Sequence, residues 1–155
     1  MTKLHLGVTD IAYATPPSNG KRKRRKSAAT ITTGEVAEIL EDEYHPMEHY
    51  WELHKEEIAK SLEGSLAGAL ETAMMTGSLP DNAFASAESE IEAGFKKMLS
   101  EGELEGLGYP GVPTQAAIKG VSHRLRHPYA KSNPRRPSLI DTGLYQASFK
   151  SWFEE

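Results

Sequence analysis

The chain has 155 residues, a length that suits a single domain spanning 1–155 and is large enough to bury a hydrophobic core. It has no cysteine, which excludes disulfides and thiolate metal sites, and we expect no cofactor. The net charge is −4, no apolar run is long enough to cross a membrane, and no apolar signal region follows Met1, so we expect a cytoplasmic protein without a membrane segment.

Charge is segregated along the chain. Six consecutive cations form a basic run at 21–26, and residues 119–136 carry six further cations and no acid. Between these basic segments, residues 35–105 contain eighteen acids and four bases. Complementary charge of this kind steers association and sets the register between partners. The cations that we consider interface candidates are Lys21, Arg22, Lys23, Arg24, Arg25, Lys26, Arg124, Arg126, Arg135 and Arg136.

The N-terminal region predicts a strand followed by a long loop. Leu4, Leu6 and Val8 alternate with other residues, which is typical of a half-buried strand. Residues 14–30 combine prolines, a glycine and the basic run, and this composition predicts a flexible basic loop. Residues 27–33 are rich in threonine and isoleucine, so this stretch is a candidate for the returning strand of a hairpin.

The basic run at 21–26 is compatible with three roles. It could neutralise nucleic-acid phosphates, dock onto an acidic protein surface, or serve only as a solvated segment. The run contains no aromatic residue, which argues against recognition of single-stranded nucleic acid by base stacking. Docking to acidic protein is the role that we favour.

Two helices are predicted in the first half of the chain. Thr32 and Glu35 have the spacing of a capping box, and the apolar residues of 36–44 mark the inner face of a short helix. Pro46 breaks or restarts it, since proline suits the first turn of a helix. Apolar residues then recur at steps of three or four as far as Met74, which predicts a long amphipathic helix that ends at Gly77.

Two glycines interrupt this long helix. Gly64 and Gly68 each cost roughly 1 kcal/mol of helix propensity relative to alanine. We therefore expect another backbone, from this chain or from a neighbouring subunit, to pack closely against them.

A second long helix and a proline-rich arm are predicted further along. The apolar residues between Phe84 and Leu99 have helical spacing, and glycines and prolines at 102–113 predict a loop. Thr114 can cap a short helix that extends to about residue 125. Residues 127–138 include three prolines and no apolar periodicity, so we expect an extended arm on the surface.

The C-terminus predicts a tight turn followed by a strand. Asp141 can cap the turn, Thr142 follows it, and Gly143 can adopt a positive φ. Trp152 lies on the opposite face of the strand from Phe149 and is an interface anchor candidate if it is exposed. The residues expected on the inner face of the strand are Tyr145, Ala147, Phe149, Ser151 and Phe153.

The predicted fold class is α+β. We expect a small antiparallel sheet, formed by the N- and C-terminal strands, to pack against the two long helices. The basic loop 14–30 and the arm 127–138 would extend from this body.

Two short motifs point to catalytic chemistry. His45, Glu48 and His49 match H-x-x-E-H, in which two imidazoles bind zinc beside a carboxylate base, and a zinc hydrolase is therefore an alternative from another class. A third ligand would have to come from elsewhere in the chain. Residues 141–143 match the Asp-Thr-Gly of aspartic proteases, but that chemistry needs two carboxylates and hence a homodimer. Few residues follow the motif, so a role in the turn is the better interpretation.

The segment 136–153 resembles a pattern near the C-terminus of neck and tail-completion (head–tail joining) proteins of tailed bacteriophages. In that pattern a proline-bearing arm enters an Ile-Asp-Thr-Gly turn, and a strand with a Ser-aromatic step follows. A Leu-His-Leu-Gly-Val strand at 4–8, a Val-Ala-Glu-Ile helix start at 36–39, two long helices and a Pro-Thr-Gln-Ala-Ala segment at 113–117 come in the same order as in the family.

The resemblance implies a structural virion protein and not an enzyme. It implies a homo-oligomeric ring, on the order of six or twelve copies, that connects the head portal assembly to the tail. The implied partners are portal or adaptor and tail proteins, with transient contact to packaged DNA. The implied location is the virion neck, after assembly in the host cytoplasm. A tail-tube terminator or minor tail protein is the related alternative.

Overall fold

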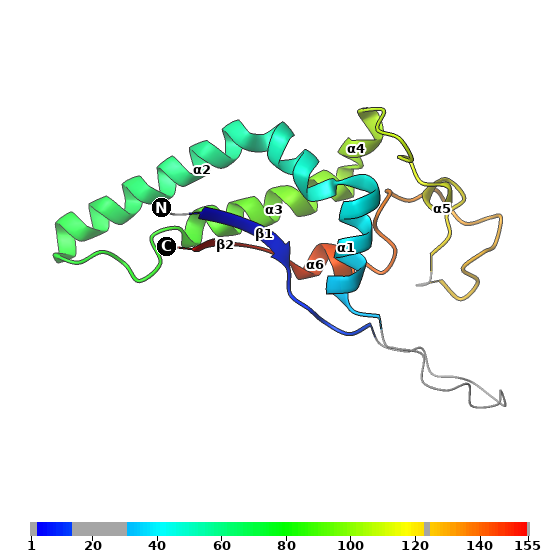
Figure 1. The fold of residues 1–155 in the computed structure, drawn as a ribbon, viewed down its shortest axis with the longest axis horizontal. Coiled ribbons are helices and arrows are strands. Elements are labelled where there is room, and N and C mark those ends of the chain that lie inside the picture. Colours follow the sequence, from blue (N-terminus) through cyan, green and yellow to red (C-terminus); the bar gives the residue numbers. More distant parts are fainter. Residues whose placement is uncertain (1–2, 14–30, 123–124, 155) are drawn as a thin grey trace.

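Strands from the two ends of the chain pair to form the sheet of this protein. In the computed structural model, which describes residues 3–13, 31–122 and 125–154, β1 (Lys3–Val8) lies antiparallel to β2 (Phe149–Glu154) (Figure 1). The register joins Lys3 to Glu154 and Val8 to Phe149. The sheet packs against α3 (Ala85–Glu101), which in turn packs along α2 (Pro46–Thr76). The predicted α+β class, with terminal strands and two long helices, is confirmed.

The strand predicted from Tyr145 to Phe153 is wrong in its first half. Residues Leu144–Ser148 form the short helix α6, and β2 begins only at Phe149. Gly143 starts this helix with φ 77°, and its carbonyl accepts a hydrogen bond from the Ala147 N–H at 2.9 Å. Tyr145 is buried, and this would hold for a residue in a helical turn as well as for one in a strand. The sequence pattern therefore could not distinguish a helix from a strand here.

The first helix begins at the predicted capping box. In α1 (Thr33–Tyr44), the Thr32 hydroxyl accepts the Glu35 N–H at 3.3 Å, and the Glu35 carboxylate accepts the Thr32 N–H at 3.1 Å. The helix ends at His45, which has a left-handed φ of 48°. Pro46 then starts α2, because its fixed φ and missing N–H suit the first turn.

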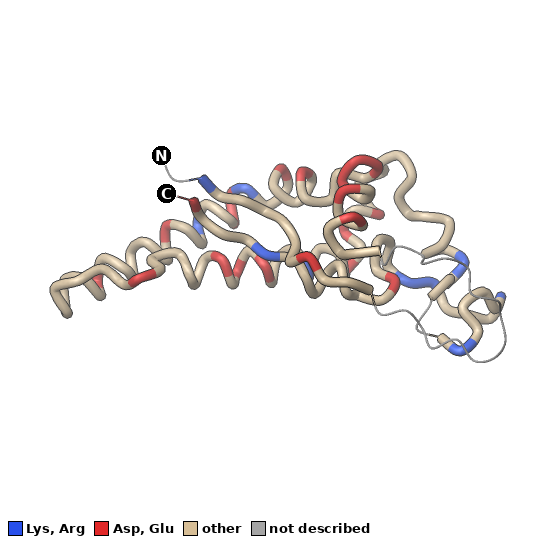
Figure 2. Tube along the Cα trace, turned by 60° about the horizontal axis from the view of Figure 1, so that its bottom comes forward, with Lys and Arg blue, Asp and Glu red and all other residues tan. Residues whose placement is uncertain are grey.

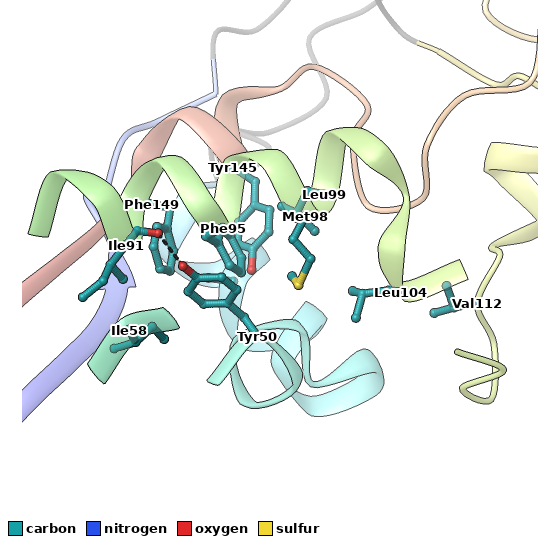
Figure 3. Close-up of a cluster of buried hydrophobic side chains, with 11 residues drawn as sticks. Tyr50, Ile58, Ile91, Phe95, Met98, Leu99, Leu104, Val112, Tyr145 and Phe149 are labelled. Atoms are coloured by element: carbon teal, nitrogen blue, oxygen red, sulfur yellow. Dashed lines mark hydrogen bonds between the residues drawn. The ribbon is translucent and has the colours of Figure 1, made fainter. Parts of the chain in front are cut away.

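The core lies between α2, α3, α6 and the sheet (Figure 3). Phe95 and Phe149 are fully buried and stack with ring centroids 3.9 Å apart. The Tyr50 hydroxyl donates a hydrogen bond to the Ile91 carbonyl at 2.9 Å, and burial raises the pKa of Tyr50 to about 12. These contacts tie the C-terminal strand to both long helices.

The second half of α2 extends beyond the rest of the fold. The helix has 31 residues and α3 has 17, and the segment that connects them turns back across α2. The Ser65 hydroxyl donates to the Ala83 carbonyl at 2.8 Å, so the connection already meets α2 well before the helix ends at Thr76. The end of α2 therefore projects from one end of an elongated molecule (Figure 1).

Two predictions for residues 102–125 are wrong. Part of the predicted loop forms α4 (Glu103–Gly106), and the helix expected as far as residue 125 is only α5 (Gln115–Ile118). Thr114 caps α5 as predicted, since its side chain accepts the Ala117 N–H at 3.2 Å. The helix stops because Gly120 adopts φ 64°.

The arm 127–138 is extended only in its second half. Its first half is a series of turns, in which the Ala130 N–H donates to the His127 carbonyl and the Asn133 N–H donates to the Ala130 carbonyl. The Asn133 side-chain amide donates to the carbonyls of His127 and Pro128, both at 3.0 Å. These bonds close the turns that the proline content alone did not reveal.

Within the described residues, no helix has the length and apolar character of a membrane span.

Candidate assembly interface

The charge segregation along the sequence becomes a segregation in space. Acidic residues follow the helices, whereas the described cations of 119–122 and 125–136 gather at the end formed by α5 and the arm (Figure 2). The basic run at 21–26 and Arg124 lie outside the described residues, so the structure does not place these predicted interface residues. Of the predicted cations, it places Arg126, Arg135 and Arg136.

Arg136 holds the arm in place. Its Nε donates to the Val121 carbonyl at 2.5 Å, and its Nη1 donates to the carbonyls of Pro137, at 3.3 Å, and Ile140. Its backbone N–H donates to the Ala117 carbonyl at 3.2 Å. The guanidinium thus satisfies three backbone acceptors within its own chain, and its position indicates a structural role for this predicted interface residue.

Arg135 is tied to the body through Glu105. An Arg135 Nη lies 2.5 Å from the Glu105 carboxylate, which also accepts the Ser138 N–H at 2.8 Å and the Ser138 hydroxyl at 2.7 Å. Burial opposes ionisation of Glu105, but the Ser138 hydrogen bonds and the Arg135 charge outweigh it and hold the pKa of the carboxyl below its usual value. The arm is therefore anchored to α4 as well as to α5.

The predicted turn at 141–143 joins the arm to α6. The Thr142 hydroxyl accepts the Leu144 N–H at 3.2 Å, and Gly143 adopts the predicted positive φ. Asp141 is partly buried beside Tyr13. Burial raises the pKa of Tyr13, and the negative charge of Asp141 adds to the rise. The turn at 141–143 therefore lies against the N-terminal segment that contains Tyr13.

A groove of about 640 Å³ opens beside this turn. Its walls come from α1, α5, the end of the arm and α6, four parts of the chain that the sequence pattern did not bring together. Most of the lining is apolar, and Glu43 and Asp141 contribute carboxylates. We call this feature the groove; its apolar lining includes Val36, Leu40, Tyr44, Ala116, Leu139 and Tyr145.

A second apolar surface lies at the opposite end of the molecule. Met74, Met75 and Leu79 have exposed fractions of 88%, 87% and 62%, and we call these three residues the tip.

Gly64 and Gly68, which were expected to lie against another backbone, have no atom within 4 Å of an added Cβ in the described chain. The part of that prediction that invoked a segment of the same chain is therefore wrong for the described residues.

Trp152 lies on the exposed face of β2, as the alternation predicted. It is 45% exposed, and its ring stacks on His5 of β1 with centroids 5.4 Å apart. The His5 Nε2 lies 2.9 Å from the Glu154 carboxylate. Trp152 thus presents one aromatic face on the outer side of the sheet, in the position of an interface anchor.

The H-x-x-E-H residues lie at the junction of α1 and α2. The His45 Nδ1 lies 3.3 Å from the Glu48 carboxylate, while the His49 ring stacks on Tyr109 with centroids 3.5 Å apart. The His49 Nδ1 is buried and lies 3.8 Å from Glu52, too far for a hydrogen bond. Within 3–13, 31–122 and 125–154, no three His, Asp or Glu side chains lie close enough to share a metal ion. The described chain therefore does not supply the third ligand that the zinc alternative needs.

Sequence reasoning missed both the groove and the exposure of the tip. A signal for the tip was present, since Met74 and Met75 directly precede the helix end in a stretch, 64–80, that has Glu71 as its single charged residue. No protein family, curated protein or solved structure matches this chain.

Proposed function

We propose that this chain is a structural protein of a tailed-phage neck, and that copies of it form or join a ring between the head portal assembly and the tail. The observation that carries the proposal is the presence of large exposed apolar side chains at both ends of an elongated fold with segregated charge. Proteins that remain monomeric seldom expose apolar patches of this kind. We propose a mechanical role without catalysis.

The four most exposed large apolar side chains of the described residues lie in the tip and in the arm. The tip supplies three exposed side chains at one end of the molecule. At the other end, Tyr129 of the arm is 74% exposed and Ile31 at the rim of the groove is 55% exposed. Burying such side chains would stabilise an assembly by roughly 25 cal/mol per Å² of apolar surface.

The charge distribution supports contacts between unlike surfaces of neighbouring copies. The helical body is acidic and the arm end is basic, so the body of one copy complements residues 119–136 of the next. Contacts between two different surfaces repeat from copy to copy, and they close into a ring when the rotation divides evenly into a circle.

The segments that carry the phage resemblance form one connected unit. The end of the arm enters the turn at 141–143, the turn starts α6, and α6 leads directly into β2, which pairs with the N-terminal strand β1. The arm, the turn and the terminal strand follow the order of the resemblance and support assignment to the neck, whereas α6, between the turn and the strand, departs from that pattern. A tail-tube terminator or minor tail protein of the same broad fold is the related candidate, and the resemblance motif supports it equally.

The test is native mass spectrometry over a concentration series, followed by mixing with isolated phage heads and isolated tails. We expect a closed oligomer, or a monomer that binds heads. Lys131→Glu, in the basic arm, should weaken assembly, whereas Lys60→Glu, the same charge change on the acidic body, is the matched control and should not weaken it. Binding to tails and not heads would favour the tail-tube terminator. A monomer that binds neither would refute the proposal.

A further inference from the structure

We propose that copies of this chain associate head to tail, with the tip of one copy seated in the groove of the next. This inference rests on the proposed ring function and names the surfaces that would form the contact. It assigns both apolar features that the fold leaves uncovered to one interface, and the occupant of the groove is a second copy of the same chain.

The tip has the composition of a docking element. Met74 and Met75 lie in the last turn of α2, and Leu79 follows the left-handed Gly77 that ends the helix. Methionine side chains are flexible and polarisable, and they adapt well to irregular apolar cavities. No segment of the described chain covers the tip, and its three side chains remain exposed. The connection to α3 passes back to Ser65, where the Ala83 carbonyl accepts the Ser65 hydroxyl.

The groove has the complementary character. Its volume of about 640 Å³ lies within the range of protein binding sites and accommodates several side chains of methionine size. Val36, Leu40 and Leu139 provide apolar walls, and Tyr44 provides an aromatic one. Ala116 of α5 is exposed and contributes a small apolar side chain to the lining.

Electrostatics favour this pairing over the symmetric one. The C-terminus of a long helix carries a partial negative charge, the last turn of α2 has no basic residue, and Glu71 and Asp81 lie on either side of the tip. The groove itself is lined by the carboxylates of Glu43 and Asp141 and the guanidinium of Arg136, which its own chain's carbonyls already bind. Lys119 and Lys131 lie outside the lining, on the α5 and arm side of the groove. A tip-to-tip contact would bring two negative helix ends together. A tip-to-groove contact instead brings one negative helix end toward the cations of α5 and the arm, with Glu43 and Asp141 as the opposing charges.

The geometry requires two different copies. The tip and the groove lie at opposite ends of the molecule, so one copy cannot fill its own groove (Figure 1). A contact between two different surfaces leaves one free tip and one free groove at each stage. Association therefore continues from copy to copy, and it ends in a ring when the rotation between copies closes.

The absence of cysteine makes a direct test available. Two single-cysteine variants are prepared, Met75→Cys on the tip and Ala116→Cys in the groove, both at exposed positions where cysteine should not disturb folding. They are mixed at the concentration used for native mass spectrometry and oxidised mildly. Ala59→Cys, exposed in the middle of α2, replaces the tip variant in the matched control.

We expect a disulfide between Met75→Cys and Ala116→Cys, and little or none in the control mixture or in either variant alone. Crosslinking of Met75→Cys with itself would indicate a tip-to-tip contact and overturn the proposal. An absence of mixed crosslinks would overturn it too, whether the protein is oligomeric or monomeric, because the contact needs no other component.

A charge variant provides a second measurement. Met75→Glu should weaken self-association by at least about tenfold, since it places a carboxylate in an apolar groove, whereas Met75→Leu should preserve it. Unchanged association of Met75→Glu would contradict the proposal. The two proposals can fail separately: a ring without the mixed crosslink refutes only the contact, and the crosslink in a protein that binds neither heads nor tails refutes only the neck function.

Discussion

Gly120→Ala tests whether the arm is held closely against α5. Gly120 has φ 64°, and an added Cβ would lie 2.7 Å from the Asn133 carbonyl oxygen and would also overlap the Pro134 carbonyl oxygen. Both contacts are with backbone, so no side chain can turn aside to relieve them. The variant must therefore distort residue 120 or displace the arm.

The cost can be estimated from the contacts involved. Placing alanine in the left-handed region costs about 1–2 kcal/mol. Displacing the arm also loses the Arg136 N–H bond to Ala117 and the Arg136 guanidinium bond to Val121, worth about 1 kcal/mol and about 1.5–3 kcal/mol respectively. We expect the free energy of unfolding to fall by about 3.5–6 kcal/mol in total, unless the arm detaches locally before the body unfolds.

The assay is urea unfolding combined with limited trypsin digestion. Gly77→Ala is the matched control, because Gly77 also has a positive φ of 82° but has no atom within 4 Å of an added Cβ. It should cost only the backbone term of about 1–2 kcal/mol. Gly120→Ala should in addition increase cleavage at Lys131 and Arg135. Equal losses of stability in the two variants, with unchanged cleavage, would refute the close approach of the arm.

Three further predictions concern the core, the arm and the exposed helix. Tyr50→Phe removes the buried hydrogen bond to the Ile91 carbonyl and should destabilise the protein by about 1–3 kcal/mol in urea unfolding; an unchanged midpoint would show that the bond contributes nothing. The pKa of Glu105 is lowered from 4.5 in the folded state, so its contribution to stability is present above pH 4.5 and is lost as the pH falls through the lowered value. Glu105→Gln should therefore flatten the acid side of a stability–pH profile, and a parallel profile would contradict this role. Gly64→Ala and Gly68→Ala face open space within the described chain, and each should stabilise the isolated subunit by up to about 1 kcal/mol, measured as an increase in thermal midpoint. Destabilisation at either position would show that another backbone packs there.

The sequence by itself determined the class of fold and the boundaries of α1 and α2. The capping box at Thr32, the proline start of α2 and the glycine end at Gly77 all appear where the pattern predicted them. Each of these signals acts through hydrogen bonds or backbone angles of neighbouring residues, so the chain encodes them locally. The alternation at β1 and in the second half of the C-terminal strand is local in the same way.

The tertiary structure decided which of the patterned surfaces are covered. The apolar stripe of α2 runs along the helix without interruption, but the shorter α3 covers only part of it, and Leu70 and Met74 remain exposed. Tyr145 lies on a helical turn and not on a strand, because Gly143 starts the turn and α1 and α3 receive its side chain.

The candidate interface depended on tertiary structure most of all. Arg136 appeared in the sequence as one cation among many, yet its guanidinium binds three carbonyls of the arm and its surroundings. The groove combines walls from α1, α5, the arm and α6, which are far apart in the chain. Contacts between distant segments depend on which surfaces meet on folding, and no local pattern in the sequence records that outcome.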